Sequence, residues 1–124
     1  MLLGSFIVKA KLPTLNEMIS ASKIHFAVYS KMKKKWTNMV WAMALKEHVD
    51  KATEPVVVRM LWFEPAKSRR DPDNVVASKK FILDGLVKAG VIENDSHKYV
   101  EGFIDKVYYK GTEHFVEVQV HCVS

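Results

Sequence analysis

The sequence contains a single cysteine, Cys122, which excludes an internal disulfide and a zinc site built from cysteines. One cysteine also fits a reducing compartment. No apolar run approaches the roughly 18 residues of a membrane helix, and the first five residues lack the positive charge that opens a signal peptide. We therefore expect a soluble intracellular protein with no membrane partner.

The usual motifs of several enzyme classes are also missing. The five glycines form no phosphate-binding loop, the five histidines show no metal or triad spacing, and no segment is repeated. Nothing calls for an organic cofactor. With 124 residues, 48% of them hydrophobic, the chain is long enough for one compact domain, residues 1–124, and too short for two. A net charge of +5 favours an anionic partner only weakly.

Apolar periodicity predicts strands and helices in the order β, α, β, α, β, β. Strands are expected at residues 5–11 and 56–63, and the second is apolar on both faces, as is typical of a central strand. The segments 99–110 and 114–123 are expected to form a hairpin with its turn at Gly111-Thr112. The predicted class is α+β, one small domain with a mixed sheet of about four strands and helices packed on it.

The first helical region should start at Thr14, which opens a capping-box pattern, and run to about Lys51 with a break near residues 20–22. Its second half is apolar on two sides, so it is either a deeply buried core helix or a subunit interface. The residues on these two sides are Met32, Trp36, Met39 and Met43, then Trp41 and Leu45. A second helix is expected from Val75 to Ala89, with Gly90 as its stop.

Cations and carboxylates gather around a proline in the segment Lys67-Ser-Arg-Arg-Asp-Pro-Asp-Asn74. Pro72 pushes Asp71 toward extended geometry, in which residues i and i+2 point to the same side. Asp71 and Asp73 would then lie about 6 to 7 Å apart and repel each other by roughly 2 to 3 kcal/mol. A hard cation such as Mg²⁺ would relieve that repulsion. The alternative is a turn in which Asp73 or Asn74 caps the next helix.

More charged residues follow this segment. Lys79 falls inside the apolar stripe of the second predicted helix and Lys80 at its edge. Because an unpaired buried charge is costly, the ammonium of Lys79 should either meet carboxylates or phosphate or extend along the helix to water. A third carboxylate, Asp95, lies just past the helix. Earlier in the chain, the basic cluster Lys33, Lys34 and Lys35 is either solvated or phosphate-binding.

Three stretches together resemble the RusA family of Holliday junction resolvases, in the form found in bacteria and their prophages. They are Arg69-Arg-Asp-Pro-Asp-Asn74, Lys80 with the helix end Leu83-Asp-Gly-Leu86, and Gly90-Val-Ile-Glu-Asn-Asp95. Weaker similarity extends to residues 15–17 and 62–65, so it covers most of the chain. The resemblance implies that Asp71, Asp73 and Asp95 bind the metal and that Lys80 is the essential lysine. The commoner family form has its lysine about one helical turn nearer the asparagine, so Lys79 stays an alternative.

The same resemblance implies a Mg²⁺-dependent endodeoxyribonuclease of the bacterial cytoplasm, with Mn²⁺ as a substitute. Its substrate would be a four-way DNA junction, cut by paired nicks by a homodimer. Backbone phosphates would be held by Lys67, Arg69, Arg70 and Asn74 near the aspartates and by Lys33, Lys34 and Lys35. Three alternatives stay open: a non-catalytic nucleic-acid binder, a structural module, and a metal nuclease acting on other branched DNA or RNA.

Overall fold

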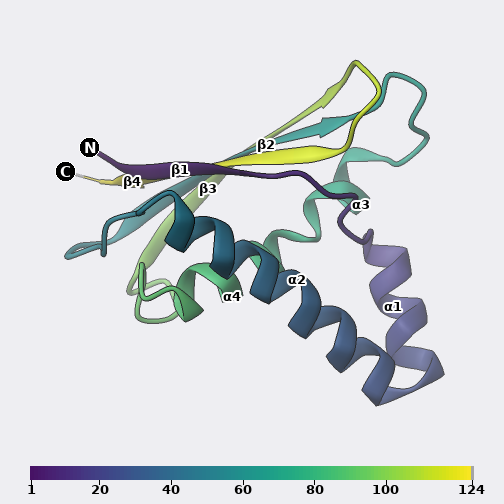
Figure 1. The fold of residues 1–124 in the computed structure, drawn as a ribbon, viewed down its shortest axis with the longest axis horizontal. Helices are drawn as coiled ribbons and strands as arrows, with labels where there is room; N and C mark the ends of the chain where they lie inside the picture. The colour runs from purple at the N-terminus through teal and green to yellow at the C-terminus, as the bar shows by residue number, and fades with distance from the viewer. Residues whose placement is uncertain (124) are drawn as a thin grey trace.

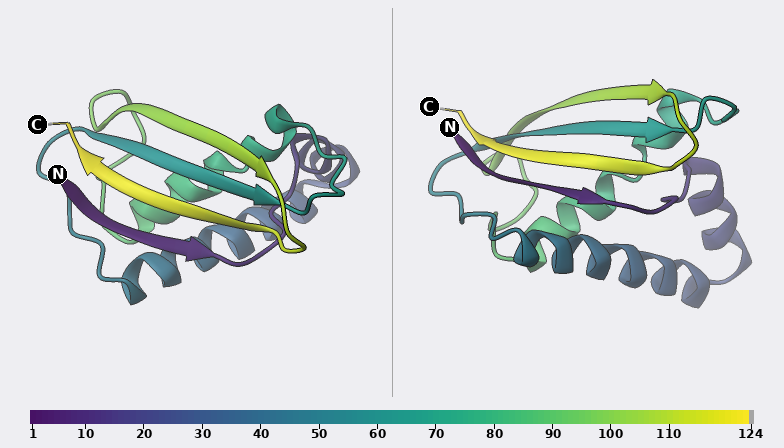
Figure 2. Two further views of the ribbon diagram at one scale, coloured as in Figure 1. Left: turned by 90° about the horizontal axis from the view of Figure 1, so that it is seen from above. Right: turned by 45° about the horizontal axis from the view of Figure 1, so that its top comes forward.

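Four strands form one mixed sheet, and the helices lie against one of its faces, as the computed structural model shows for residues 1–123 (Figure 1, Figure 2). The strands are β1 (Leu2–Val8), β2 (Val56–Glu64), β3 (Val100–Tyr109) and β4 (Phe115–Cys122). The helices are α1 (Leu15–Ile24), α2 (Phe26–Lys46), α3 (Pro72–Val76) and α4 (Lys79–Lys88). The predicted α+β class and the order of elements are confirmed.

The sheet order is β1-β4-β2-β3, which places β2 in the interior as predicted. β2 is parallel to β3 and antiparallel to β4, and β1 is antiparallel to β4. The predicted hairpin of the last two strands is therefore wrong, because β2 lies between them. The turn is located correctly, with Gly111 at φ 72°, but it crosses the end of β2. There Lys110 N donates to Glu64 O at 2.9 Å, and Ala66 N donates to Gly111 O at 3.0 Å.

The core lies between the helix-covered face of the sheet and helices α2 and α4. Strand periodicity sends alternate residues of β2 and β4 into it, and the opposite face of the sheet carries no helix (Figure 2). Val40 and Ala44 of α2 are buried, and the α2 residues Trp36, Met39 and Met43 pack against this core. The core interpretation of α2 is thus confirmed for that stripe.

Helix boundaries differ from the prediction in three places. α1 and α2 separate at His25, not at residues 20–22, and His25 caps α2 by accepting a hydrogen bond from Ala27 N at 3.0 Å. α2 ends at Lys46, five residues before the predicted end. The helix expected over residues 75–89 is two helices, because the chain breaks at residues 77–78, where the hydroxyl of the buried Ser78 donates to Pro13 O.

The first strand lies at Leu2–Val8, three residues earlier than predicted, whereas the capping box and the helix stop are found where they were predicted. The capping box is present, since Thr14 Oγ1 accepts from Glu17 N at 3.2 Å and Glu17 Oε1 accepts from Thr14 N at 3.3 Å. Gly90 follows α4 with φ 78°, and Cys122 is buried. Within residues 1–123, no helix has both the length and the apolar character needed to cross a membrane.

Candidate metal and nucleic-acid site

The loop after β2 delivers Asp71 and Asp73 to the surface. Asp71 is the N-cap of α3, with φ −71° and ψ 151°, and its main-chain oxygen accepts from Asn74 N and Val75 N, each at 3.0 Å. Pro72 occupies the first turn of α3, a position that tolerates its missing N–H. The extended geometry predicted for this pair therefore holds at Asp71, whereas Asp73 is helical. The capping residue is Asp71, and neither Asp73 nor Asn74.

Both carboxylates are exposed and free. The side chain of Asp71 makes no capping bond, and within residues 1–123 neither Asp71 nor Asp73 forms a side-chain hydrogen bond or ion pair. Their charges reach a common neighbour, because loss of solvent and then the charges of Glu64, Asp71 and Asp73 raise the pKa of Tyr109, against the opposing effect of Arg70. Two negative charges thus act on one phenol without a cation of their own, which leaves them available to bind one.

Asp95, the third predicted ligand, is paired with Lys80. Lys80 Nζ lies 2.9 Å from Asp95 Oδ2 and 3.3 Å from Asp84 Oδ1, and Lys33 Nζ lies 3.7 Å from Asp84 Oδ2. The hydrogen bond from Lys80 lowers the pKa of Asp95, and the same bond raises the pKa of Lys80. This surface cluster joins α2, α4 and the loop after α4. It brings one lysine of the predicted basic cluster to the side of Asp95.

Lys79 points to a different carboxylate. Its ammonium pairs with Asp105 of β3 and lies 4.5 Å from the centre of the Phe103 ring. Asp105 also accepts a hydrogen bond from Trp62 Nε1 at 2.9 Å. Lys79 therefore meets a carboxylate, as one of its two alternatives held, but this carboxylate belongs to the sheet and is not one of the predicted metal ligands. Of the two alternatives for the essential lysine, only Lys80 contacts a predicted metal ligand.

The donor set fits Mg²⁺ through two of the three aspartates. No three Asp, Glu, His or Cys side chains in residues 1–123 gather closely enough to hold a metal ion, so Asp95 does not join Asp71 and Asp73 in this conformation. Mg²⁺ is commonly bound by one or two carboxylates and keeps several waters. The free pair Asp71 and Asp73 matches that mode, whereas Asp95 is neutralised by Lys80.

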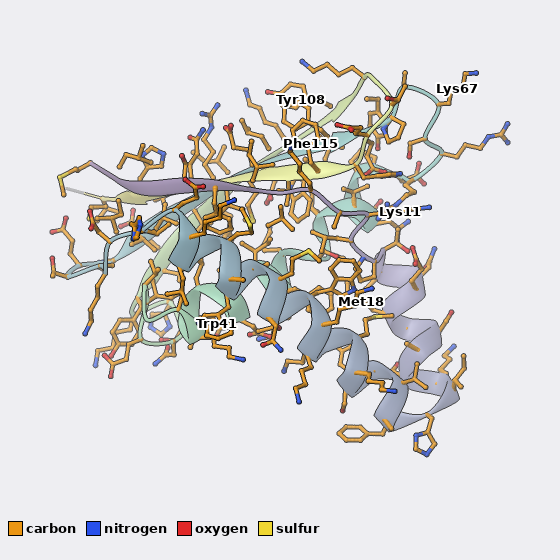
Figure 3. All side chains as sticks on the ribbon, in the orientation of Figure 1. Lys11, Met18, Trp41, Lys67, Tyr108 and Phe115 are labelled. Atoms are coloured by element: carbon orange, nitrogen blue, oxygen red, sulfur yellow. The ribbon has the colours of Figure 1, made fainter. Side chains whose placement is uncertain are left out.

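A cavity of about 330 Å³ opens beside Asp71. One wall comes from the connection between β1 and α1 and the first turn of α1, and the other from the loop after β2 and the start of α3. The lining residues are Lys11, Thr14, Asn16, Glu17, Arg69, Arg70, Asp71 and Asn74. Figure 3 labels Lys11 where the chain passes from β1 to α1, and Lys67 on the loop that leads to Asp71. Lys11 was missed because only the fold brings residue 11 next to residue 71.

The predicted phosphate contacts differ in their surroundings. Lys67 and Arg69 are exposed, and neither has a side-chain partner within residues 1–123. Arg70 is turned inward, with its side chain 15% exposed and Nε 3.5 Å from Glu64 Oε1. On α2, Lys33 pairs with Asp84, Lys35 lies over the Trp36 ring at 4.6 Å, and Lys34 is exposed.

Glu64, at the end of β2, is a buried charge that the sequence reading did not identify. It is 4% exposed, and it accepts a hydrogen bond from Ser68 Oγ at 2.9 Å. His114 Nδ1 lies 3.0 Å from Glu64 Oε2, on the other side of the carboxylate. A signal was present, because Glu64 follows Val56, Val58, Met60 and Trp62 on the buried face of β2. A charge at such a position requires partners.

Comparison with known proteins adds no assignment for this site. No protein-family model matches the chain, and no curated protein matches it. Another cavity, of about 580 Å³, lies along β1 and α2 and includes none of the predicted site residues in its lining. The functional proposal therefore rests on the side chains around Asp71 and on the resemblance of the sequence segments that carry them.

Proposed function

We propose that the chain is a Mg²⁺-dependent endodeoxyribonuclease that resolves four-way DNA junctions by paired nicks, the activity implied by its resemblance to the RusA family. The observation that carries this proposal is the free carboxylate of Asp71, which lines a cavity together with two exposed cations and is followed two residues later by the free carboxylate of Asp73. Those cations are Lys11 and Arg69. Carboxylates bind the metal and cations hold phosphate in such chemistry.

Each residue has a role in this proposal. Asp71 and Asp73 would hold the cation. Lys11, Lys67 and Arg69 contact backbone phosphates, which positions DNA without reading its sequence. When bound, Mg²⁺ would offset the charge on the phosphate and activate a water. Lys80 would supply a positive charge for the phosphate, and Asp95, which is paired with Lys80 in this structure, would add a third carboxylate oxygen to the metal site only if it left Lys80.

The proposal favours a nuclease over a non-catalytic binder for an electrostatic reason. A surface that only binds DNA gains from every cation and loses from every exposed carboxylate nearby. Asp71 lines a cavity with basic residues, Asp73 follows two residues later, and neither carboxylate has a protein partner within residues 1–123, so they would weaken DNA binding unless a metal ion neutralised them. A metal-free binder gives no reason for their presence.

A symmetric junction has two equivalent cleavage points, so the proposal includes a homodimer with two-fold symmetry. Of the two apolar sides of α2, the one with Trp36, Met39 and Met43 packs inside the domain, and Leu45 on the other side remains 47% exposed. The compartment proposed is the bacterial cytoplasm, where junction DNA is found.

The test is cleavage of a labelled synthetic four-way junction and of a matched linear duplex, each with Mg²⁺ or EDTA. Wild type should nick the junction in opposed strands only with Mg²⁺ and should spare the duplex, and Asp73→Asn should abolish cutting. Asp50→Asn is the matched control, because Asp50 is exposed and has no side-chain partner within residues 1–123. A junction that is bound but stays uncut with every metal tried would leave the binding module as the function. Cutting of flaps or RNA in preference to the junction would assign a different metal nuclease.

A further inference from the structure

The loop between β2 and α3 is held in place at one residue, Arg70. Its side chain contacts Glu64 through the ion pair at 3.5 Å, and its Nη2 donates to Leu12 O. Its main-chain oxygen accepts a hydrogen bond from the Tyr109 hydroxyl. Its main-chain nitrogen donates to Ser68 Oγ at 3.2 Å. The main chain of Arg70 and its Nη2 are thus hydrogen-bonded to β3, to the loop itself and to the connection before α1, whereas within residues 1–123 Nε makes only the ion pair with Glu64 of β2.

Glu64 is the centre of these contacts. Glu64 Oε1 accepts a hydrogen bond from Ser68 Oγ at 2.9 Å and also faces Arg70. Glu64 Oε2 lies 3.0 Å from His114 Nδ1. Arg70 Nη1 lies 3.4 Å from His114 Nδ1. When His114 Nδ1 carries a proton and donates it to Glu64, this nitrogen has no lone pair left to accept a hydrogen bond from Arg70. The buried carboxylate therefore also connects the loop to His114, the residue before β4. Tyr109 is in register with Glu64 on the neighbouring strand, so both fixed points sit at the same level of the sheet.

We propose that Arg70, clamped by Glu64 and Tyr109, is the positioning residue that fixes the Asp71 carboxylate, and that it does not bind phosphate. Asp71 follows Arg70 directly, and its backbone angles set the direction of the free carboxylate. Without the contacts of Arg70 the loop would be more mobile, and the Asp71 carboxylate would no longer keep a fixed position relative to Asp73. The inference rests on the proposed function in one respect, since it takes Asp71 as a cation ligand.

The experiment compares Glu64→Gln and Tyr109→Phe with matched controls. Glu101→Gln makes the same chemical change at an exposed glutamate of β3 that has no partner within residues 1–123. Tyr108→Phe makes the same change one residue away, at a ring that stacks on Phe63 on the helix-free face of the sheet. If Glu64→Gln fails to fold, Tyr109→Phe carries the test, since it removes one hydroxyl from a partly exposed residue.

Three readouts separate positioning from phosphate binding and from general stability. Hydrogen exchange at the amides of Arg70, Asn74 and Val75 should accelerate in Glu64→Gln and Tyr109→Phe and stay unchanged in both controls. Mn²⁺ affinity, measured by electron paramagnetic resonance, should fall about 10- to 100-fold, the usual cost of losing a group that orients a metal ligand. Junction kcat should fall at saturating DNA while KM stays within about twofold, because a residue that holds a metal ligand acts after the substrate is bound.

Unchanged exchange at these amides would overturn the proposal, and so would a raised KM with Mn²⁺ affinity intact, which is the behaviour of a phosphate contact. The proposed function fails separately, if wild type neither binds Mn²⁺ nor cuts DNA. The exchange data then decide the positioning role alone, since they need neither metal nor substrate.

Discussion

Replacing Gly85 by alanine should destabilise the protein, although alanine is the better helix former. Gly85 lies in α4 where this helix crosses α2. A Cβ at residue 85 would lie 2.4 Å from both Cβ and Cγ1 of Val40 and 3.1 Å from Trp41 N. An ordinary carbon contact is about 3.5 to 4 Å. Because Cβ of Val40 is fixed to the backbone, the two helices must move apart by about 1 Å.

Two opposing terms set the size of this effect. Alanine in place of glycine in a helix interior gains about 1 kcal/mol. Overpacking a well-packed core costs about 1 to 3 kcal/mol, and the backbone-fixed contact with Val40 puts this case near the upper end. The net loss should be about 2 kcal/mol, which for a domain of this size lowers Tm by about 8 °C.

The assay is thermal and urea unfolding of wild type, Gly85→Ala, Val40→Ala and the double variant. Val40→Ala removes one of the two clashing atoms, so the two losses should be less than additive. A Gly85→Ala protein with a Tm equal to or above that of wild type would show that helix propensity dominates. It would refute the close packing of α2 on α4, which brings Lys33 beside Asp84.

Three further predictions concern the charged residues. Lys80→Met should cost less than about 1 kcal/mol of unfolding free energy at this exposed pair. That loss should be the same from about pH 5 to 9, because the pKa of Asp95 lies below 3.8 and that of Lys80 above 10.5. The contribution of this ion pair to the unfolding free energy should disappear only as pH falls through the lowered pKa of Asp95 or rises through the raised pKa of Lys80. A loss, measured by urea unfolding, that varies between about pH 5 and 9 would contradict this prediction. Lys80→Met should lower junction kcat more than Lys79→Met, whereas Lys79→Met should lower the unfolding free energy more; the reverse ranking would make Lys79 the catalytic lysine. Arg69→Gln should reduce the slope of log affinity for DNA against log salt by about 1, and an unchanged slope would remove Arg69 from the phosphate contacts.

Much of the fold follows from local sequence pattern. The strict alternation of β2 and the capping box at Thr14 are short-range signals, and both are confirmed. The prediction that β3 and β4 pair was wrong. It assumed that consecutive strands pair, as they usually do, and nothing in the local sequence shows that the loop between them crosses the end of β2. The break between α3 and α4 at Ser78 could not be predicted for a similar reason. Its hydroxyl is satisfied by Pro13, which is far away in the sequence.

The site was predictable where its residues are neighbours in sequence. Asp71 and Asp73 are separated by one residue, and both carboxylates are exposed and free within residues 1–123, but the extended geometry predicted for the pair holds only at Asp71. Residues brought together by tertiary structure could not be derived in this way. Lys11 reaches the cavity beside Asp71 only through the fold, and the inward turn of Arg70 depends on Glu64.

The most direct test of the central claim, that Asp71 and Asp73 form a divalent-cation site, is a Mn²⁺ titration followed by electron paramagnetic resonance. Wild type and Asp50→Asn should bind the ion with the same affinity, and Asp71→Asn and Asp73→Asn should each lose that binding. Asp95→Asn should weaken it only if Asp95 leaves Lys80 to join the ion. Wild-type protein that leaves Mn²⁺ free in solution, or binding that survives both Asp71→Asn and Asp73→Asn, would contradict the account.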